Sequence, residues 1–279
     1  MNFKKMAAFF VTVILIVAAM LPCAAADEKT DVAVYINNAI FESGKTKIFN
    51  GLTYVPLRAF CDQMTECNVN WDAETKTATI RCEELVITAS AYDAYICANG
   101  RYLYSGSNNY IDTDNRLYVP IRAIAKAFGA EVTWDTENSA AIVGKPTTPI
   151  QCDEEFYNQS DLYWLSRIIS AESRGEPLLG QIAVGNVVLN RMKLPGYAQS
   201  VYGIIFDTRF GVQFTPIANG TIYEKPYDCS VIAAKICLEG YSVSDDILFF
   251  MNPSISASKW MMYNCTHVLT IANHAFYAY

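Results

Sequence analysis

The chain has 279 residues, of which 52% are hydrophobic and 18% charged, and its formal net charge is −7. This length and apolar fraction predict one large or two ordinary globular domains and exclude a largely disordered chain. The acidic balance argues against nucleic acid as a partner, because nucleic-acid binding needs a basic surface. Two histidines leave little room for a zinc enzyme, so we expect neither a metal site nor an organic cofactor.

The N-terminal segment has the pattern of a secretory signal peptide. Two lysines precede an apolar run, and small residues suited to cleavage end at Ala26. We therefore expect a signal peptide over residues 1–26, a secreted protein and no stable membrane span after cleavage, with a mature charge of −9 instead of −7. An uncleaved membrane anchor and a lipid attached to Cys23 are the alternatives.

Eight cysteines remain after residue 26, four in each half of the chain: Cys61, Cys67, Cys82, Cys97, Cys152, Cys229, Cys237 and Cys265. An even number in each half of an exported chain predicts disulfides within each half. Cys229 and Cys237 should not pair, because they lie about 12 Å apart along one helix predicted over residues 229–239. Cys61 and Cys67 are similarly separated if the helix after Arg58 continues. Free thiols are the alternative.

The first half of the chain contains an internal repeat. The segment Tyr54–Phe60 recurs as Tyr118–Ile124, and Val69–Asp72 recurs as Val132–Asp135 at nearly the same distance. Each unit reads as a strand, a helix that begins near a proline, and a further strand.

With these motifs, residues 32–144 resemble the stalk-like N-terminal domain of copper amine oxidases, an α+β accessory module of secreted bacterial proteins. The resemblance implies no copper. We expect the Trp and Arg residues of the repeat to serve as core and salt-bridge groups and not as ligand contacts. Residues 145–157 are rich in Pro and Thr at their start and read as a linker, which leaves residues 158–279 as the domain that carries the chemistry.

A helix predicted over residues 161–173, with Ser160 as its N-cap, places Glu172 among apolar side chains. On the helical wheel Leu162, Trp164, Leu165, Ile168 and Ile169 share one arc with Glu172, and polar residues fill the opposite arc. A carboxyl group that faces the interior loses hydration, so its pKa should rise to suit a general acid. The alternative is a structural carboxylate neutralised by Arg174 or Arg191.

The helix should end at a turn in which Gly175 is the C-cap and Pro177 begins the next helix, over residues 178–192. Small residues such as Gly185 allow close packing of that second helix. Glu172 thus ends one helix beside a turn, a common position for a functional side chain.

Several sequence blocks follow one another across the second half of the chain: Ala171–Pro177, Gly180–Val184, Val188–Arg191, Gln213–Pro216, Asn219–Thr221, Phe250–Pro253, Ala257–Trp260 and Asn273–Tyr277. In content and order they resemble the SleB-type spore-cortex-lytic cell wall hydrolases. The departures are mild: Ser173, Thr215, Met251 and Ala272 stand where Ala, Ser, Tyr and Gly are usual.

The resemblance implies a lysozyme-like α/β fold, mainly helical with a small sheet, so we expect an α+β protein overall. It implies Glu172 as the catalytic residue, peptidoglycan glycan strands as the partner, and cleavage between N-acetylmuramic acid and N-acetylglucosamine by lytic transglycosylation. The same resemblance implies localisation to the cell wall or spore envelope. Spore cortex, lysed during germination, and vegetative wall are the alternative substrates.

Transglycosylation needs only one carboxyl group, whereas hydrolysis needs a second one about 5 to 9.5 Å away. Glu176 is the nearest candidate in sequence, although its turn favours a helix-starting charge. A hydrolytic muramidase and a non-catalytic wall or spore-coat binding protein are therefore the alternatives.

Further side chains could contact sugar rings, hydroxyls or acetamido groups: Gln213, Phe214, Thr215, Tyr223, Asn252, Ser258, Lys259, Trp260 and His274. Core packing is an equal alternative for the aromatic residues. For His274 a buried, hydrogen-bonded role is the alternative to a role in the site.

Overall fold

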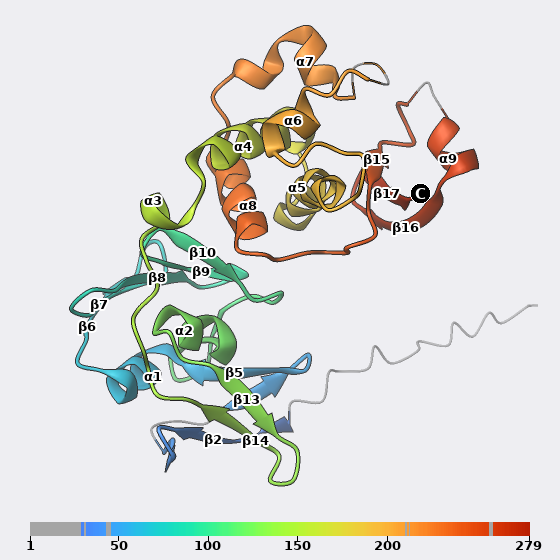
Figure 1. Ribbon diagram of the computed structural model, residues 1–279. Helices are drawn as coiled ribbons and strands as arrows, with labels where there is room; N and C mark the ends of the chain where they lie inside the picture. The colour runs from blue at the N-terminus through green and yellow to red at the C-terminus, as the bar shows by residue number, and fades with distance from the viewer. Residues whose placement is uncertain (1–28, 31, 43–45, 210, 212, 257–258) are drawn as a thin grey trace, which may run out of the picture.

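The computed structural model describes residues 29–279 except residues 31, 43–45, 210, 212 and 257–258, so the expected signal peptide lies outside the described residues. A strand-rich N-terminal domain is followed by a mainly helical C-terminal domain (Figure 1). The predicted α+β class is confirmed. Within the described residues, no helix combines the length and the apolar character needed to cross a membrane.

The N-terminal domain contains three sheets and two short helices. One sheet has the order β1-β4-β5-β12-β11, a second β10-β9-β8-β7-β6 and a third β13-β14-β2-β3. The strand bounds are β1 Lys29–Thr30, β2 Ala33–Ile36, β3 Ala39–Ile40, β4 Lys47–Phe49, β5 Leu52–Pro56, β6 Asn68–Asp72, β7 Thr77–Arg81, β8 Val86–Ser90, β9 Tyr95–Ala98, β10 Arg101–Tyr104, β11 Tyr110–Ile111, β12 Leu117–Pro120, β13 Val132–Asp135 and β14 Ala140–Val143. The helices are α1 (Leu57–Met64) and α2 (Ile121–Ala127).

The predicted repeat is confirmed as strand, helix and two further strands in each unit. The equivalent strands β5 and β12 pair antiparallel, and Val55 lies opposite Val119, its own counterpart in the repeat. Because equivalent residues face each other across an antiparallel pair, the two units are related locally by a twofold axis between these valines. Pro56 and Pro120 end their strands in extended conformation as N-caps, one residue before the helical turn expected for them.

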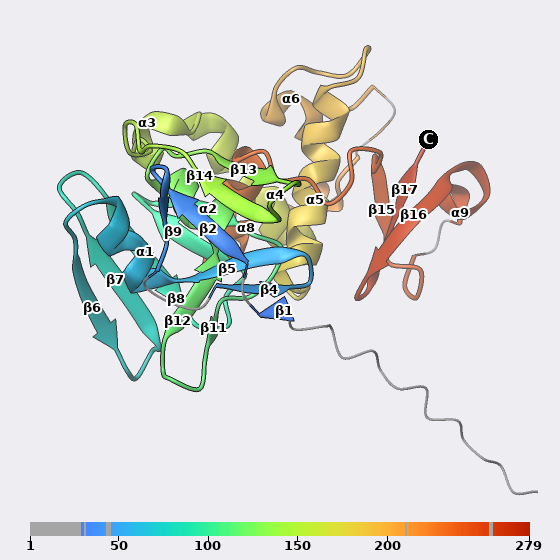
Figure 2. The same ribbon diagram turned by 90° about the horizontal axis from the view of Figure 1, so that it is seen from below.

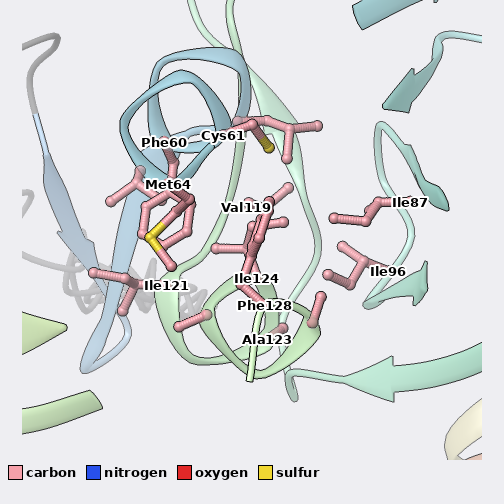
Figure 3. Close-up of a cluster of buried hydrophobic side chains, with 14 of the residues drawn as sticks. Phe60, Cys61, Met64, Ile87, Ile96, Val119, Ile121, Ala123, Ile124 and Phe128 are labelled. Carbon is pink, nitrogen blue, oxygen red and sulfur yellow. The ribbon is translucent and has the colours of Figure 1, made fainter. Parts of the chain in front are cut away.

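The domain core lies between the two repeat helices and the strands beneath them. Phe60 and Met64 on α1 approach Ile124 and Phe128 near α2, with Val119 between the helices (Figure 3). The apolar residues at helical spacing therefore bury one face of each short helix, which neither helix could do alone.

The expectation that the repeat tryptophans belong to the core is wrong. Trp71 and Trp134 are 40% and 42% exposed, because β6 and β13 are edge strands, although each tryptophan lies opposite a buried alanine, Ala78 or Ala141, on the inner face of its sheet. The arginines of the motif are exposed as well, and within the described part of the chain neither Arg58 nor Arg122 forms an ion pair.

Disulfide pairing is confirmed only in part for the first half, where Cys61 and Cys97 are free, and not for the second half. Cys67 and Cys82 form a disulfide across the ends of β6 and β7. Cys229 and Cys237 are unpaired, as their spacing on one helix requires, but Cys152 and Cys265 are free too, so the expected disulfides of the second half are absent among the described residues. The reason is placement: the four thiols lie before α3, at the two ends of α8 and before β16, on separate elements.

The C-terminal domain is built on the crossing of α4, α5 and α8. Its elements are α3 Asp153–Phe156, α4 Gln159–Ser173, α5 Leu178–Met192, α6 Val201–Ile205, α7 Thr215–Asn219, a 3-10 turn η1 Thr221–Tyr223, α8 Asp228–Leu238, α9 Trp260–Asn264, and strands β15 Phe249–Met251, β16 Thr266–Ile271 and β17 His274–Ala278. Their buried apolar side chains form a second core. The small sheet β15-β17-β16 lies beside α5, away from the N-terminal domain (Figure 2).

The predicted linker follows the surface of the N-terminal domain and ends in α3. The Thr147 hydroxyl donates to the Gly129 carbonyl at 2.7 Å, and the Ile150 amide donates to the Ala127 carbonyl at 3.3 Å. A Cβ on Gly129 would lie 2.3 Å from the Thr148 carbonyl oxygen, so glycine is required where the linker passes. Composition predicted an irregular segment, and these contacts hold it against the domain.

A buried carboxylate joins the two domains. Glu239, just after α8, accepts two hydrogen bonds from Arg101 on β10 at 2.7 and 2.9 Å. It also accepts from Lys126 at 2.9 Å and from the Tyr157 hydroxyl at 2.8 Å. Next to this group, Lys235 on α8 binds Asp153 of α3 at 2.6 Å, where Figure 1 shows α8 against β10 and α3.

Candidate active site

The site begins at α4, whose last turn carries Glu172. Asn158, and not the predicted Ser160, is the N-cap, because its side chain accepts from the amides of Ser160 and Asp161. The predicted apolar arc is confirmed for Leu165, Ile168 and Ile169, which are fully buried. Glu172 therefore lies in the last turn of α4, next to the buried apolar side chains of the helix.

The polar arc of α4 is not a solvent face. Ser166, Ser170 and Ser173 are all buried, since α5 and α8 cover the helix on several sides. Each hydroxyl finds a backbone partner: Ser173 donates to the Ile169 carbonyl at 2.7 Å, and Ser170 accepts from the Tyr227 amide at 3.1 Å. Small hydroxyl side chains that bond to the backbone can therefore be buried, although a helical wheel places them on the polar face of the helix.

The turn after Glu172 differs from the prediction in its geometry. Arg174 is the C-cap, in right-handed helical conformation, and Gly175 does not adopt the left-handed conformation expected of a C-cap glycine. The Glu176 amide instead donates to the Ser173 carbonyl at 2.8 Å, which closes the turn. Pro177 is the N-cap of α5, and the predicted bounds of α5 are confirmed.

Glu172 is half-buried, and loss of hydration raises the pKa of its carboxyl group to about 7. The structural alternative, neutralisation by Arg174 or Arg191, is wrong. Arg174 pairs with Glu224 at 3.6 Å, and Arg191 donates to the Leu248 carbonyl at 2.8 Å. Among the described residues, no hydrogen bond or ion pair holds the Glu172 carboxyl group, which leaves it available to a bound molecule.

Glu176 has a different environment from Glu172. Its carboxylate accepts hydrogen bonds from the amide and the side-chain Nδ2 of Asn273, at 3.1 and 3.0 Å. Its carbonyl accepts from Gln181 at 2.9 Å. Glu176 therefore ties the α4–α5 turn to the β16–β17 hairpin.

Two of the predicted substrate-contacting residues come together in an aromatic cluster under the small sheet. Phe214 lies 6.5 Å from Phe250, and Phe250 lies 5.3 Å from His274, measured between ring centres. The Arg191 guanidinium stands over Phe214 at 5.3 Å, a cation–π contact that the sequence analysis did not foresee. Phe214 is buried against Phe250 and Arg191, so it presents little surface to a sugar.

His274 is buried, as one alternative expected, but its Nδ1 has no hydrogen-bond partner among the described residues. Burial lowers the pKa of the imidazole, and the negative charge of Glu176 opposes this effect. Because the imidazole of His274 also packs against Phe250 and Phe276, we expect it to be neutral.

The remaining candidates are more exposed and more dispersed. Gln213 and Thr215 flank Phe214 and are exposed. Asn252 is half-buried, and its Oδ1 accepts from the Ser254 amide at 3.0 Å. Lys259 and Trp260 stand at the start of α9, where Trp260 packs on Phe249 at 6.2 Å. Ser258 lies outside the described residues.

An exposed aromatic group near the first half of α4 was only partly foreseen. Trp164 contacts Tyr163, Tyr202, Phe206 and Tyr223, with ring centres 4.9 to 6.2 Å apart. Tyr223 was a candidate from sequence, but Tyr202 was not. The spacing of Tyr202 and Phe206, four residues apart on and after α6, is the signal that could have found it.

In the described residues, no three His, Cys, Asp or Glu side chains are grouped as metal ligands. The site consists of a desolvated carboxyl group at a helix end, a second carboxylate bonded to a hairpin, and aromatic side chains on neighbouring elements. Such a site can supply a proton to a bound molecule.

Two family models match the chain. Residues 175–277 match the family described as Cell Wall Hydrolase, a range that begins three residues after Glu172. Residues 34–151 match the Copper amine oxidase N-terminal domain.

Relatives and solved structures match the C-terminal part. The spore cortex-lytic enzyme of Bacillus cereus strain ATCC 14579 is 34% identical over 120 residues, 43% of this chain and 45% of that protein. The enzyme of the same name from Bacillus subtilis strain 168 is 32% identical over 43% of this chain and 38% of its own length. The catalytic domain of the germination-specific lytic transglycosylase SleB from Bacillus anthracis is 34% identical, with 43% of this chain and 96% of that chain covered and a TM-score of 0.40.

The chain thus combines a C-terminal domain that matches the cell wall hydrolase family with an N-terminal domain that matches the copper amine oxidase N-terminal domain. Spore cortex-lytic enzymes are among the relatives that this C-terminal domain resembles. The chain spans less than half the length of the curated relatives named above.

Proposed function

We propose that the protein degrades peptidoglycan by cleaving the glycosidic bond between N-acetylmuramic acid and N-acetylglucosamine. The reaction is a lytic transglycosylation in which Glu172 first protonates the leaving oxygen. The same carboxylate then removes the proton from the C6 hydroxyl of the muramic acid residue as that oxygen attacks C1. The products are a shortened strand and a 1,6-anhydro sugar end, and no water is consumed.

The environment of Glu172 is the observation that carries this proposal. A general acid must hold its proton near neutral pH, and desolvation raises the pKa of Glu172 to about 7. The lack of a described side-chain partner leaves that proton free for a substrate oxygen. Family resemblance and local physics select the same residue.

The other carboxylate supports transglycosylation over hydrolysis. A hydrolase needs a second carboxyl group free to act as nucleophile or to activate water. Glu176, the candidate in sequence, already accepts two hydrogen bonds from Asn273. We therefore assign it a positioning role in the turn.

We further assign substrate contacts to residues on the rim of the site. Gln213, Thr215, Asn252 and Lys259 offer hydrogen-bonding groups, Trp260 offers an exposed ring, and Ser258 belongs to the same sequence block. Phe214 and His274 stand beneath them as packing groups, because both are buried.

The biological setting that we propose is lysis of spore cortex during germination, outside the cytoplasmic membrane. The names of the relatives support it, and so does the signal-like segment that precedes the first domain.

The test is digestion of purified cortex and of vegetative peptidoglycan by the full chain, beside Glu172→Gln, with mass spectrometry of the released fragments. Anhydro-ended fragments from the unaltered protein alone support the proposal. Reducing ends would replace it with hydrolysis, and an inert wild type would leave a binding protein. Faster digestion of cortex than of vegetative wall supports the role in germination.

A further inference from the structure

The two repeat units of the N-terminal domain each build the same hollow. One has a volume of about 540 Å³ and is lined by Pro56, Arg58 and Trp71. The other has a volume of about 560 Å³ and is lined by the equivalent Pro120, Arg122 and Trp134. The repeat therefore duplicates a concave site together with its sequence motif.

The local twofold axis explains how each hollow is closed. The hollow of the first unit is completed by residues 115–117, from the strand of the second unit. The hollow of the second unit is completed by residues 51–53, the equivalent segment of the first. Each unit thus supplies the edge of the other unit's hollow, so the pair forms only when both units fold together.

The side chains of these hollows do not have the arrangement expected of structural groups. Trp71 and Trp134 are not fully buried: each keeps about two fifths of its surface exposed, at the same position of each unit, where it lines a hollow. Arg122 donates to the Val132 carbonyl at 2.7 Å, which fixes its guanidinium at the rim beside Trp134. No described carboxylate pairs with Arg58 or Arg122, so both guanidinium groups can donate hydrogen bonds to an oxygen of a ligand.

We propose that these two hollows, which we name the Trp–Arg hollows, are a pair of binding sites for the N-acetylated glycan strand of the cell wall. An exposed indole offers a flat apolar face to the C–H face of a pyranose ring, and the guanidinium donates to an acetamido or carboxylate oxygen. Volumes near 550 Å³ lie within the range of small-molecule sites and suit one or two sugar rings. The choice of this occupant rests on the proposed function of the C-terminal domain.

The charges favour a glycan over an acidic wall polymer. The chain carries a net charge of −7, which opposes a densely anionic ligand. The first hollow is lined by Arg58, Arg116 and Asp62, and the second by Arg122, Lys126 and Glu239, with Glu239 already held by Arg101. Each hollow therefore combines two cationic side chains with one carboxylate, which suits a ligand with few charges, and ring stacking on the tryptophan supplies the rest of the affinity.

The position of the second hollow links binding to the C-terminal domain. Glu239, Gly240 and Tyr241 form one of its walls, so a strand seated there contacts both domains. The first hollow belongs to the N-terminal domain alone. Two weak sites on one rigid unit raise the affinity for a polymer through effective concentration.

The experiment measures co-sedimentation of the full chain with sacculi stripped of teichoic acid. All proteins carry Glu172→Gln, so that binding is measured without digestion. Trp71→Ala and Trp134→Ala should each weaken binding at least about fivefold, and the double variant about twentyfold or more. Ile40→Ala, which removes an exposed apolar side chain outside both hollows, is the control and should bind like the parent. Unchanged binding by the double variant would overturn the proposal.

Two further measurements separate ligand contact from loss of structure. Trp71→Phe and Trp134→Phe keep a flat ring and should bind within about threefold of the parent, while thermal unfolding compares the stability of all variants. Arg58→Gln and Arg122→Gln leave the indoles in place and should also weaken binding. A soluble oligomer of N-acetylglucosamine should compete with sacculi, and competition by free teichoic acid alone would overturn the choice of occupant.

The outcome is independent of catalysis. If the unaltered protein releases no fragments but binding still depends on the tryptophans, the proposed function fails and the Trp–Arg hollows stand. If fragments are released and tryptophan substitution leaves binding unchanged, the hollows fail and the proposed function stands.

Discussion

The Glu176 carboxylate accepts two hydrogen bonds from Asn273, one from its backbone amide and one from its side chain. Glu172, four residues earlier, has no such partner in the described part of the chain, and burial raises its pKa to about 7. Two carboxyl groups one helical turn apart in sequence therefore differ in role, because one is fixed by a hairpin and the other is desolvated and open.

Substitution of Glu172 should reduce activity but not stability, whereas substitution of Glu176 should reduce stability more than activity. Glu172→Gln should reduce fragment release about 10²–10⁴-fold, the usual contribution of a general acid, with little loss of stability. Glu176→Gln, the matched variant, should retain activity within about tenfold and lower the free energy of unfolding by about 1–2 kcal/mol, since it weakens bonds to a charged acceptor. Initial rates and urea denaturation of both variants check this. Equal loss of activity in a stable Glu176→Gln would instead indicate a second catalytic carboxylate.

Activity should depend on the protonation of Glu172. The acid form is present below its pKa, so the rate of fragment release should fall as the pH rises through about 7. Initial rates on stripped sacculi between about pH 5 and 9, at constant ionic strength, measure this limb. A descending limb near the ordinary glutamate pKa of 4.5 would show that Glu172 is not desolvated in solution.

The same raised pKa predicts a cost in stability. The folded protein holds a proton on Glu172 that the unfolded chain releases near pH 4.5, so the free energy of unfolding should decrease as the pH rises from about 4.5 to 7. Glu172→Gln cannot lose that proton, and at pH 8 it should be more stable than the parent by about 1–3 kcal/mol. Urea denaturation of both proteins at pH 4.5 and pH 8 gives the two differences. Equal stability at pH 8 would contradict the desolvation of Glu172.

Periodicity and motifs were sufficient to predict the α+β class, the bounds of α5 and the buried face of α4. These features depend on the local spacing of apolar residues, which can be read from the sequence itself. The partial burial and raised pKa of Glu172 could be predicted for the same reason, because a helical wheel places this acid among apolar side chains.

The errors occurred where a distant element decides the outcome. Ser166, Ser170 and Ser173 of α4 are buried where other helices cover them. The arginines expected to neutralise Glu172 have other partners. The repeat tryptophans were predicted as core residues because large aromatic side chains are mostly buried, and only the strand order shows that Trp71 and Trp134 lie on edge strands, which leaves them partly exposed. Such contacts join segments that are far apart in the sequence, so local sequence patterns cannot predict them.

Gly185 should not tolerate a side chain. It lies where α5 crosses α4 and α8, and a Cβ there would stand 2.7 Å from the Cys237 Sγ and 2.8 Å from the Ile169 Cδ1. Gly185→Ala should therefore lower the free energy of unfolding by about 1–3 kcal/mol through overpacking, despite the better helix propensity of alanine. Gly175→Ala is the control, because its Cβ would meet no atom within 4 Å. A more stable Gly185→Ala would mean that the three helices are packed less closely than described.

The buried Glu239 should hold the two domains together. Glu239→Ala removes the acceptor of Arg101, whose side chain is 6% exposed, and a buried charge without a partner costs about 3–5 kcal/mol. Proteolysis within residues 145–152 should accelerate in this variant as the domains separate, and urea denaturation should split into two transitions. Glu224→Ala is the matched control, since its pair with Arg174 is exposed and contributes about 1 kcal/mol or less.

Low pH should separate the two domains of the parent protein, as Glu239→Ala is expected to do at neutral pH. Burial alone would raise the pKa of Glu239, but the hydrogen bonds from Arg101 and Lys126 outweigh it and hold the pKa below the ordinary value of 4.5. A depressed pKa contributes stability above about pH 4.5 that is lost as the pH falls further. Proteolysis of the linker by an acid-active protease should therefore accelerate below about pH 4 in the parent, whereas in Glu239→Ala it should already be fast at pH 6 and change little. A parent linker that stays resistant at pH 3 would show that other contacts hold the domains.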